Sequence, residues 1–218
     1  MSNNVKSIVL HTAEKMFLSV GYEKTSIRAL EKETGVSYGS IMNAFGCKES
    51  ILCELVAFVL EGQFEATSKL LKDKTDDKIL FYATETVLQL YMAESSEHIR
   101  EMYNVSYSMP ETSKIIYKTI TGKLEDIFKE HLPDLVTKDF YCLELATAGI
   151  MRNYLSRPCD MFFTMEMKVE KFLELTFTLY QVQQNKIKET IDFIRQFDFK
   201  KIAQNTIDNM LSYLESKV

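Results

Sequence analysis

Hydrophobic positions recur at helical spacing along most of the chain. The clearest repeat opens the sequence and places its apolar residues on one helical face. It comprises Val5, Ile8, Val9, Ala13, Met16, Phe17 and Val20. Gly21 follows directly, and glycine is the usual residue just after the last turn of a helix. The pattern therefore predicts a first helix that ends at Gly21.

Two short helices are predicted next, over residues 26–34 and 38–45. Each has a hydroxyl side chain before it, which is a preferred N-cap, and a glycine after it. The caps and terminating glycines are Thr25 and Gly35 for the first helix, and Ser37 and Gly46 for the second. This spacing predicts two helices joined by a tight glycine turn.

The rest of the chain reads as longer helices. One starts near Lys48 and is apolar on nearly all sides from Ile51 to Leu60, so we expect several neighbours to bury it. The others cover 78–94, 97–109, 111–131, 138–156 and 164–184, and residues 186–217 form one or two more. Only 7 glycines and 3 prolines occur in 218 residues, too few for the turns of a β-sandwich or barrel. The expected fold class is all-α.

Composition and charge restrict both the expected location of the protein and the kind of DNA contact it is able to make. The net charge is −5, and residues 1–60 hold as many Glu as Lys and Arg, so any contact with DNA must be local. The 4 cysteines form no CxxC pair, which fits a reducing cytoplasm. The first residues contain no signal peptide, and the longest apolar run is about half of the ~20 residues that a membrane span needs. We expect a cytoplasmic protein without membrane contact.

The helix predicted over 38–45 has an outer face suited to a DNA groove. Ile41 and Phe45 would anchor it in the core, which turns its small and polar residues outward. Asn43 is able to form paired hydrogen bonds with adenine, and helix N-termini suit phosphate. The candidate DNA-binding residues are Thr25, Ser26, Arg28, Ser37, Tyr38, Gly39, Ser40, Asn43 and Lys48. The alternative is an ordinary corner of a helical bundle.

A set of residues at fixed spacing favours the first interpretation. It comprises Ala13, Phe17, Gly21-Tyr22, Thr25-Ser26-Ile27-Arg28, Gly35-Val36-Ser37, Gly39, Ile41, Phe45 and Lys48-Glu49. With these residues, the segment 5–60 resembles the N-terminal domain of TetR-type (TetR/AcrR-like) transcriptional regulators. Many members carry Ser where this chain has Cys47.

The resemblance implies a ligand-responsive regulator that acts as a repressor. Residues 1–47 would form a helix-turn-helix DNA-binding domain, and residues 48–218 a helical ligand-binding and dimerisation domain. A homodimer would place two copies of helix 38–45 in the major groove of a palindromic double-stranded operator, with half-sites ~34–36 Å apart. Lys24, Arg28 and Lys48 offer six charged contacts per dimer, so the log–log salt slope would be about −5.

The resemblance also implies that helices 138–156 and 164–184 pair with their copies in a second subunit. The candidate interface residues are Ala146, Gly149, Ile150, Phe172, Leu173, Thr176 and Tyr180. The alternative is that these apolar stripes close the core of the single chain.

Tyrosine and methionine are concentrated in the segment 82–117, where they suit the lining of a pocket for a mostly apolar or aromatic molecule. The candidate ligand residues are Met102, Tyr103, Tyr107, Tyr117 and Arg152. Arg152 and Arg100 are candidate counter-charges for an acidic ligand. The resemblance implies that a bound ligand would act by shifting the helix that starts near Lys48. The alternative is routine core packing.

The sequence offers little chemistry for catalysis. No HExxH, P-loop or GxSxG motif occurs, and the three histidines are isolated, so we expect no enzyme, cofactor or metal. His11 and Glu14 share a helix face and are expected to be a solvated pair. Two other functions stay open: a redox-responsive regulator acting through Cys47 at a helix N-terminus, and a helical adaptor that binds only protein.

Overall fold

The computed structural model describes residues 2–217, and the outer ends of the two expected domains, Met1 and Val218, lie outside the described residues. Residues 2–217 form helices and no strand, which confirms the all-α expectation. The helices are α1 (Ser2–Val20), α2 (Ile27–Thr34), α3 (Tyr38–Phe45), α4 (Lys48–Leu71), α5 (Lys78–Glu94), α6 (Glu97–Ser108), α7 (Pro110–Phe128), α8 (Thr137–Ser156), α9 (Met165–Leu179), α10 (Gln184–Ile194) and α11 (Phe199–Glu215).

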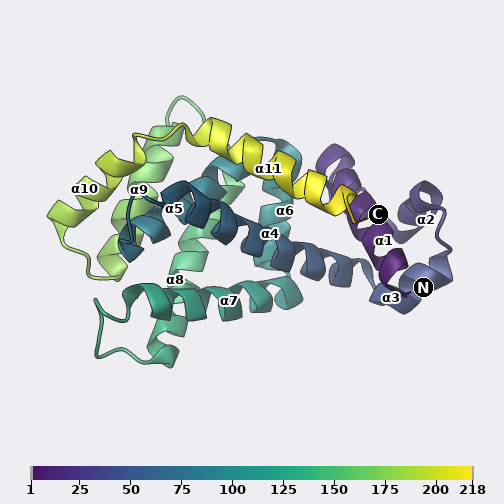
Figure 1. The fold of residues 1–218 in the computed structure, drawn as a ribbon, viewed down its shortest axis with the longest axis horizontal. Coiled ribbons are helices and arrows are strands. Elements are labelled where there is room, and N and C mark those ends of the chain that lie inside the picture. Colours follow the sequence, from purple (N-terminus) through teal and green to yellow (C-terminus); the bar gives the residue numbers. More distant parts are fainter. Residues whose placement is uncertain (1, 218) are drawn as a thin grey trace.

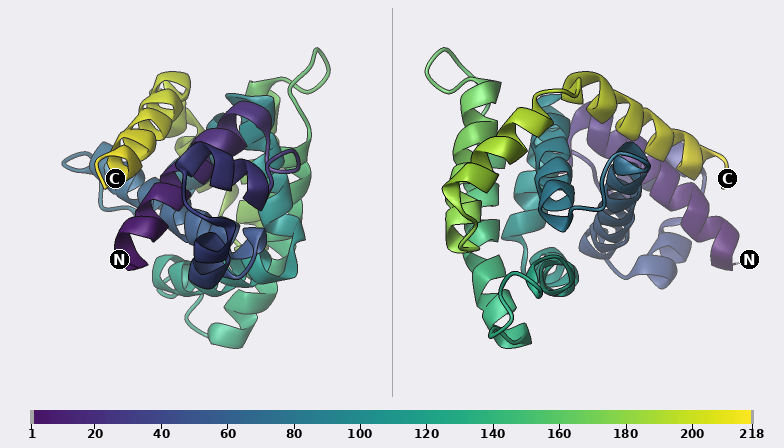
Figure 2. Two further views of the ribbon diagram at one scale, coloured as in Figure 1. Left: turned by 90° about the vertical axis from the view of Figure 1, so that its right-hand side faces the viewer. Right: turned by 60° about the vertical axis from the view of Figure 1, so that its left-hand side comes forward.

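The molecule is elongated, with a small unit of α1–α3 at one end, here called the head (Figure 1). Helix α4 leads from the head into a larger body formed by α5–α10. Helix α11 returns along the body until its C-terminal end lies beside α1, as the two views in Figure 2 also show. Head and body are therefore joined by two long helices and by contacts of α1 with α6.

Most helix ends lie where the sequence predicts them, but two differ. Thr25 does not cap α2, because its side chain is buried and its hydroxyl donates to the Gly21 carbonyl at 2.8 Å. Ser26 caps the helix instead and accepts a hydrogen bond from the Ala29 N–H at 3.1 Å. Helix α9 ends at Leu179, shortly before Gln181 takes a left-handed backbone conformation with φ of 57°.

Helix α4 is surrounded on several sides, as its apolar sequence predicts. It contacts helices of both the head and the body, and its buried side chains extend from Ile51 to Leu71. Gly62 lies against α11, where an added Cβ would stand 2.5 Å from the Met210 Cε atom. A methyl group here would need only the flexible end of the Met210 side chain to move, so the approach of α4 and α11 does not require this glycine.

The stripe expected at a subunit interface on α9 belongs to the core instead. Tyr180 is completely buried, stacks on Phe128 with ring centroids 4.2 Å apart, and donates a hydrogen bond to the Thr147 hydroxyl at 3.1 Å. The other core residues among those candidates are Phe172, Leu173 and Thr176. On α8 the small residues Ala146 and Gly149 are exposed and Ile150 is partly buried. The α9 candidates are therefore unable to contact a second subunit directly.

Candidate functional site

The turn between α2 and α3 is fixed by local hydrogen bonds. Gly35 takes a left-handed conformation with φ of 69°, which suits glycine, and its N–H bonds the Glu31 carbonyl. The Glu31 side chain accepts a hydrogen bond from the Tyr38 N–H at 2.7 Å. The Ser37 hydroxyl accepts from the Ser40 N–H at 3.2 Å, as the sequence predicts for an N-cap. The first turn of α3 is therefore held in one orientation relative to α2.

Helix α3 divides its residues between core and surface as predicted. Ile41 and Phe45 are buried beneath the helix. The residues on its outer side and at its cap are exposed: Ser37, Tyr38, Gly39, Ser40 and Asn43. An added Cβ at Gly39 would meet no atom within 4 Å, so packing inside the chain does not require this glycine. The outer face is small and polar and leaves room for a close partner.

Two further candidate residues lie beside this face at the start of α2. Ser26 and Arg28 are exposed, and the Arg28 guanidinium carbon is 6.0 Å from the centre of the Tyr38 ring. Helix N-termini present unpaired N–H groups that favour anions. The exposed face of α3 thus continues into a site suited to phosphate.

Lys48 and Thr25 have structural roles that the sequence did not reveal. The Lys48 ammonium donates to the carbonyls of Tyr22 and Thr25, each at 3.0 Å, and lies 4.0 Å from the centre of the Tyr22 ring. Lys48 therefore joins the start of α4 to the loop before α2. The expectation that both side chains contact phosphate is corrected, because one is buried and the other is bound to carbonyl groups.

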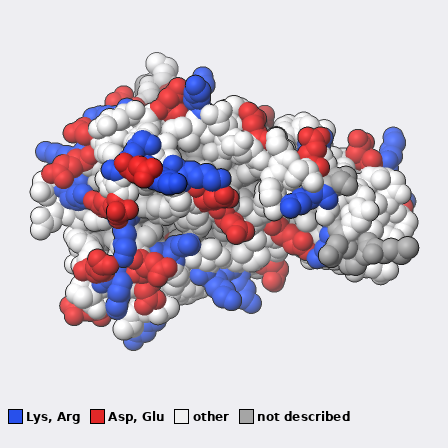
Figure 3. Space-filling view, in the orientation of Figure 1, with Lys and Arg blue, Asp and Glu red and all other residues white. Residues whose placement is uncertain are grey.

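Charges on the head are mixed. Figure 3 shows acidic and basic side chains interspersed over the face in view, without a continuous basic patch on the head. Lys24, Arg28 and Lys32 are exposed, but so are Glu23 and Glu33. Non-specific attraction to DNA is therefore weak, and recognition has to come from the few residues around α3.

This arrangement coincides with a known family pattern. Residues 9–55 match the family model described as bacterial regulatory proteins, tetR family. The head is a TetR-type DNA-binding domain. The match identifies a DNA-binding transcriptional regulator and covers the whole α2–α3 pair together with most of α1 and the start of α4. A comparison with curated proteins found no significant match.

Replacing Lys48 with Met in this TetR-type domain should loosen the head without removing a phosphate contact. We expect a lower midpoint of thermal unfolding and weaker DNA binding, with an unchanged log–log salt slope. With Lys48 excluded, Lys24 and Arg28 would leave four charged contacts in the expected dimer and a slope of about −4.

Lys24→Met is the matched control, because Lys24 is exposed on the same loop. It should reduce the magnitude of the slope by about 2 per dimer and leave the unfolding midpoint unchanged. Fluorescence anisotropy at several salt concentrations measures both slopes. A smaller slope for Lys48→Met would show that its ammonium leaves the carbonyl groups to bind phosphate.

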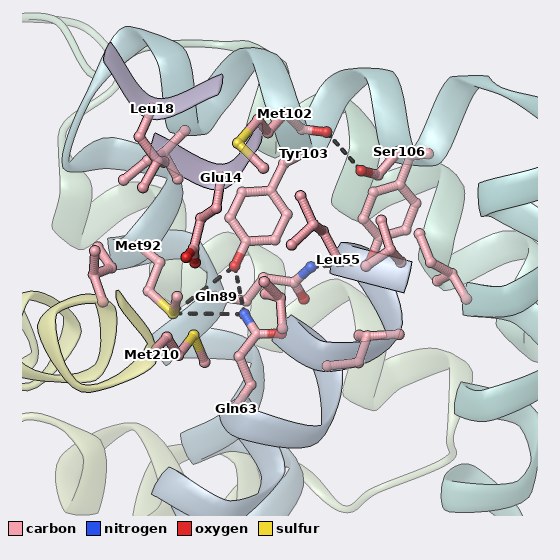
Figure 4. A pocket seen from close by; sticks show the side chains of 17 residues that line it. Glu14, Leu18, Leu55, Gln63, Gln89, Met92, Met102, Tyr103, Ser106 and Met210 are labelled. Carbon is pink, nitrogen blue, oxygen red and sulfur yellow. Dashed lines mark hydrogen bonds between the residues drawn. The ribbon is translucent and has the colours of Figure 1, made fainter. Parts of the chain in front are cut away.

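A cavity of about 70 Å³ lies between the head and the body, lined by residues of α1, α4, α5, α6, α7 and α11. Met102, Tyr103 and Tyr107 line it (Figure 4). Two candidates do not: Arg152 is exposed on α8, and Tyr117 is partly buried on α7. The second proposed counter-charge, Arg100, forms an ion pair with Glu94 at 3.3 Å outside this cavity.

Buried polar groups give the cavity its chemistry. The Gln63 amide donates to the Tyr103 hydroxyl at 2.5 Å and to the Met92 thioether at 3.6 Å. Glu14 points from α1 toward the same groups (Figure 4), and burial raises the pKa of its carboxyl to about 7. His11 and Glu14 are both buried, which corrects the expectation of a solvated pair.

A second cavity of about 40 Å³ lies in the body and is lined by residues of α4 to α9. It is lined by two further buried carboxyl groups, Glu85 and Glu144, and burial raises the pKa of each. Gln89 and Tyr107 line both cavities, and the Gln89 amide donates to the Tyr107 hydroxyl at 3.0 Å. This pair forms a polar partition between them.

The first cavity is connected to the head by short paths. Glu14 and Leu18 belong to α1, which is itself part of the head. Helix α6 reaches the head through Glu101, whose carboxylate accepts a hydrogen bond from the Glu23 N–H at 2.8 Å. Glu101 immediately precedes Met102 of the cavity lining. The cavity lining therefore includes residues of α1, α4 and α6, and α6 is also bonded to the head.

Cys47 is exposed at the start of α4, with its sulfur 3.2 Å from the Ser50 hydroxyl oxygen, and forms no side-chain cap. The redox role proposed for it stays a prediction. Within residues 2–217, no helix has the length and hydrophobicity needed to cross a membrane.

Proposed function

We propose that the protein is a repressor that binds a palindromic operator as a homodimer and is released by a small molecule. Residues 1–47 would read DNA, and residues 48–218 would bind the effector and form the dimer. The observation that carries the proposal is the exposed polar face of α3, held by Ile41 and Phe45 on a head that shares a cavity with the body.

The size of the cavity supports a mechanical response. Its volume of about 70 Å³ is well below the ~300–1,000 Å³ of ordinary ligand pockets. A molecule larger than a few atoms must therefore displace α1, α4 or α6 in order to enter. Since α1 and α4 flank α2 and α3 in the chain, this displacement would reorient the head. Moving the population from 99% DNA-competent to 1% requires a preference for the released state of roughly 5.5 kcal/mol.

The proposed dimer uses the outward faces of α8 and α9 rather than the buried stripe. Large apolar side chains are exposed there: Tyr141, Leu145, Met167, Leu175 and Leu179. Gly149 is exposed between the turns of α8, and an added Cβ would meet no atom within 4 Å. This surface is apolar enough to pair with its own copy. The lack of a side chain at Gly149 leaves room for two helices to approach closely.

Leu145→Asp is expected to convert the dimer to a monomer, because the interface would bury an unpaired carboxylate. Sedimentation velocity measures the change in mass. Val20→Asp is a matched control, since Val20 is similarly exposed at the end of α1 away from α8. A dimer that survives Leu145→Asp with unchanged affinity would place the interface elsewhere.

Selection of genomic fragments by the purified protein tests the proposed function. An enriched palindrome with half-sites ~34–36 Å apart is the expected result. Enrichment of no sequence would contradict the repressor proposal and favour the helical adaptor.

A further inference from the structure

The cavity shared by head and body contains hydrogen-bond acceptors that lack donors. One carboxyl oxygen of Glu14, Oε2, and the amide oxygen of Gln63 are buried without a hydrogen-bond partner. Both residues line the cavity, and Figure 4 shows the Glu14 carboxyl turned toward the side on which the Gln63 amide nitrogen bonds Tyr103 and Met92. Buried acceptors without donors are unfavourable, so this cavity favours an occupant that carries N–H groups.

The charges around the two cavities have one predominant sign. Among the described residues that line them, Glu14, Glu85 and Glu144 carry carboxyl groups and Lys123 carries the one ammonium group. The Lys123 ammonium group lines the second cavity and lies 5.0 Å from the centre of the Phe64 ring. No Lys or Arg lines the first cavity, so a positive occupant has no competitor there.

Burial keeps the carboxyl of Glu14 partly protonated near neutral pH, since it raises the pKa to about 7. A cation beside Glu14 favours the ionised form and offsets the unfavourable burial of its charge. An anion beside it would have the opposite effect. The cavity should therefore bind cationic ligands more tightly than anionic ligands.

The remaining wall suits the body of such a ligand. Tyr103 and Tyr107 present aromatic rings, which attract cations and pack against apolar groups. Met92 and Met102 contribute flexible thioether side chains that adapt to irregular shapes. The wall is otherwise almost entirely apolar. A small polar cation without an apolar body would leave most of this surface uncovered.

We propose that the cavity binds an organic cation, a protonated amine on an apolar or aromatic body, with its ammonium group at the carboxyl of Glu14. The inference rests on the proposed function only in naming this molecule as the effector. It replaces the acidic ligand that Arg152 and Arg100 had suggested, because neither arginine lines the cavity.

Calorimetry with three matched probes tests the proposal on the full chain without DNA. The probes are phenethylammonium, the neutral phenethyl alcohol and the anionic phenylacetate. We expect the ammonium to bind roughly tenfold or more tightly than the alcohol, and phenylacetate to bind more weakly than either. Glu14→Gln should reduce the advantage of the ammonium over the alcohol to less than about threefold. Glu61→Gln, an exposed position on α4, is the control and should retain it.

Three results would overturn the proposal: equal affinities for the ammonium and the alcohol, a preference that survives Glu14→Gln, or no binding of the ammonium at millimolar concentration. Repeating the titrations with the selected palindrome bound separates this inference from the proposed function. A charge preference without release of DNA supports the cation site and contradicts the effector role. Equal release by the alcohol and by the ammonium supports the effector role and contradicts the cation site.

Discussion

Replacing Asn43 with Ala is expected to weaken binding to the selected operator at least roughly thirtyfold. A paired hydrogen bond between an Asn side chain and adenine contributes about 1–3 kcal/mol of base discrimination. A homodimer makes this contact twice, so the loss is about 2–6 kcal/mol. The same change should relax base preference at one position in each half-site.

The structure favours this result because Asn43 is exposed on α3 while its neighbours in the helix hold the backbone in place. Ile41 and Phe45 anchor the helix in the core, and Ser37 caps its first turn. Alanine has a higher helix propensity than asparagine, so the substitution should leave the stability of the head unchanged or slightly increased. A loss of affinity would therefore report on DNA contact and not on folding.

Fluorescence anisotropy with the selected palindrome and its single-base variants measures both effects. Asn205→Ala on the exposed side of α11 is the matched control and should bind like the unaltered protein. Unchanged affinity together with unchanged base preference for Asn43→Ala would mean that α3 does not read bases through this residue. Weaker binding to all sequences alike would instead indicate a backbone contact.

The head could be predicted closely because its limits depend on local chemistry. Gly35 and Gly46 have positive φ angles, and Ser37 bonds its own helix, so neighbouring residues decide where α2 and α3 end. Thr25 and Lys48 were misjudged because their partners are carbonyl groups brought close only by the tertiary fold. The sequence alone does not show whether a hydroxyl or ammonium group will bond a carbonyl group of its own fold or stay free to bind a phosphate.

The helices of the body could be predicted from the sequence. Which of their faces pack in the core and which face a second subunit could not. An apolar stripe such as that of Phe172 and Thr176 has the same period whether it covers its own core or a second subunit. The buried carboxyl groups were missed for a related reason. Glu14 stands one helical turn from Leu10 and from Leu18, which was a detectable sign of burial. Glu85 stands among residues that are nearly all buried, and only packing against α6 and α8 reveals this.

Glu85→Gln is expected to stabilise the protein by about 3 kcal/mol at pH 8 and to have little effect at pH 5. Burial raises the pKa of Glu85 from 4.5 to about 7, so the folded state binds a proton that the unfolded chain has released between these values. The stability contributed by the protonated carboxyl is complete below about pH 4.5 and is lost as pH rises to about 7. A glutamine side chain remains neutral over this whole pH range, so the variant should not lose stability as pH rises.

Chemical denaturation of the protein and the variant at both pH values measures this difference. His11 has a lowered pKa because of burial and so changes stability in the opposite direction over part of this window. Its contribution is the same in both proteins and cancels when the variant is compared with the unaltered chain. Glu61→Gln is the control, since its exposed carboxyl should leave the pH dependence unchanged. If Glu85→Gln were no more stable at pH 8, the Glu85 carboxylate would be hydrated or paired inside the body, and burial would not raise its pKa.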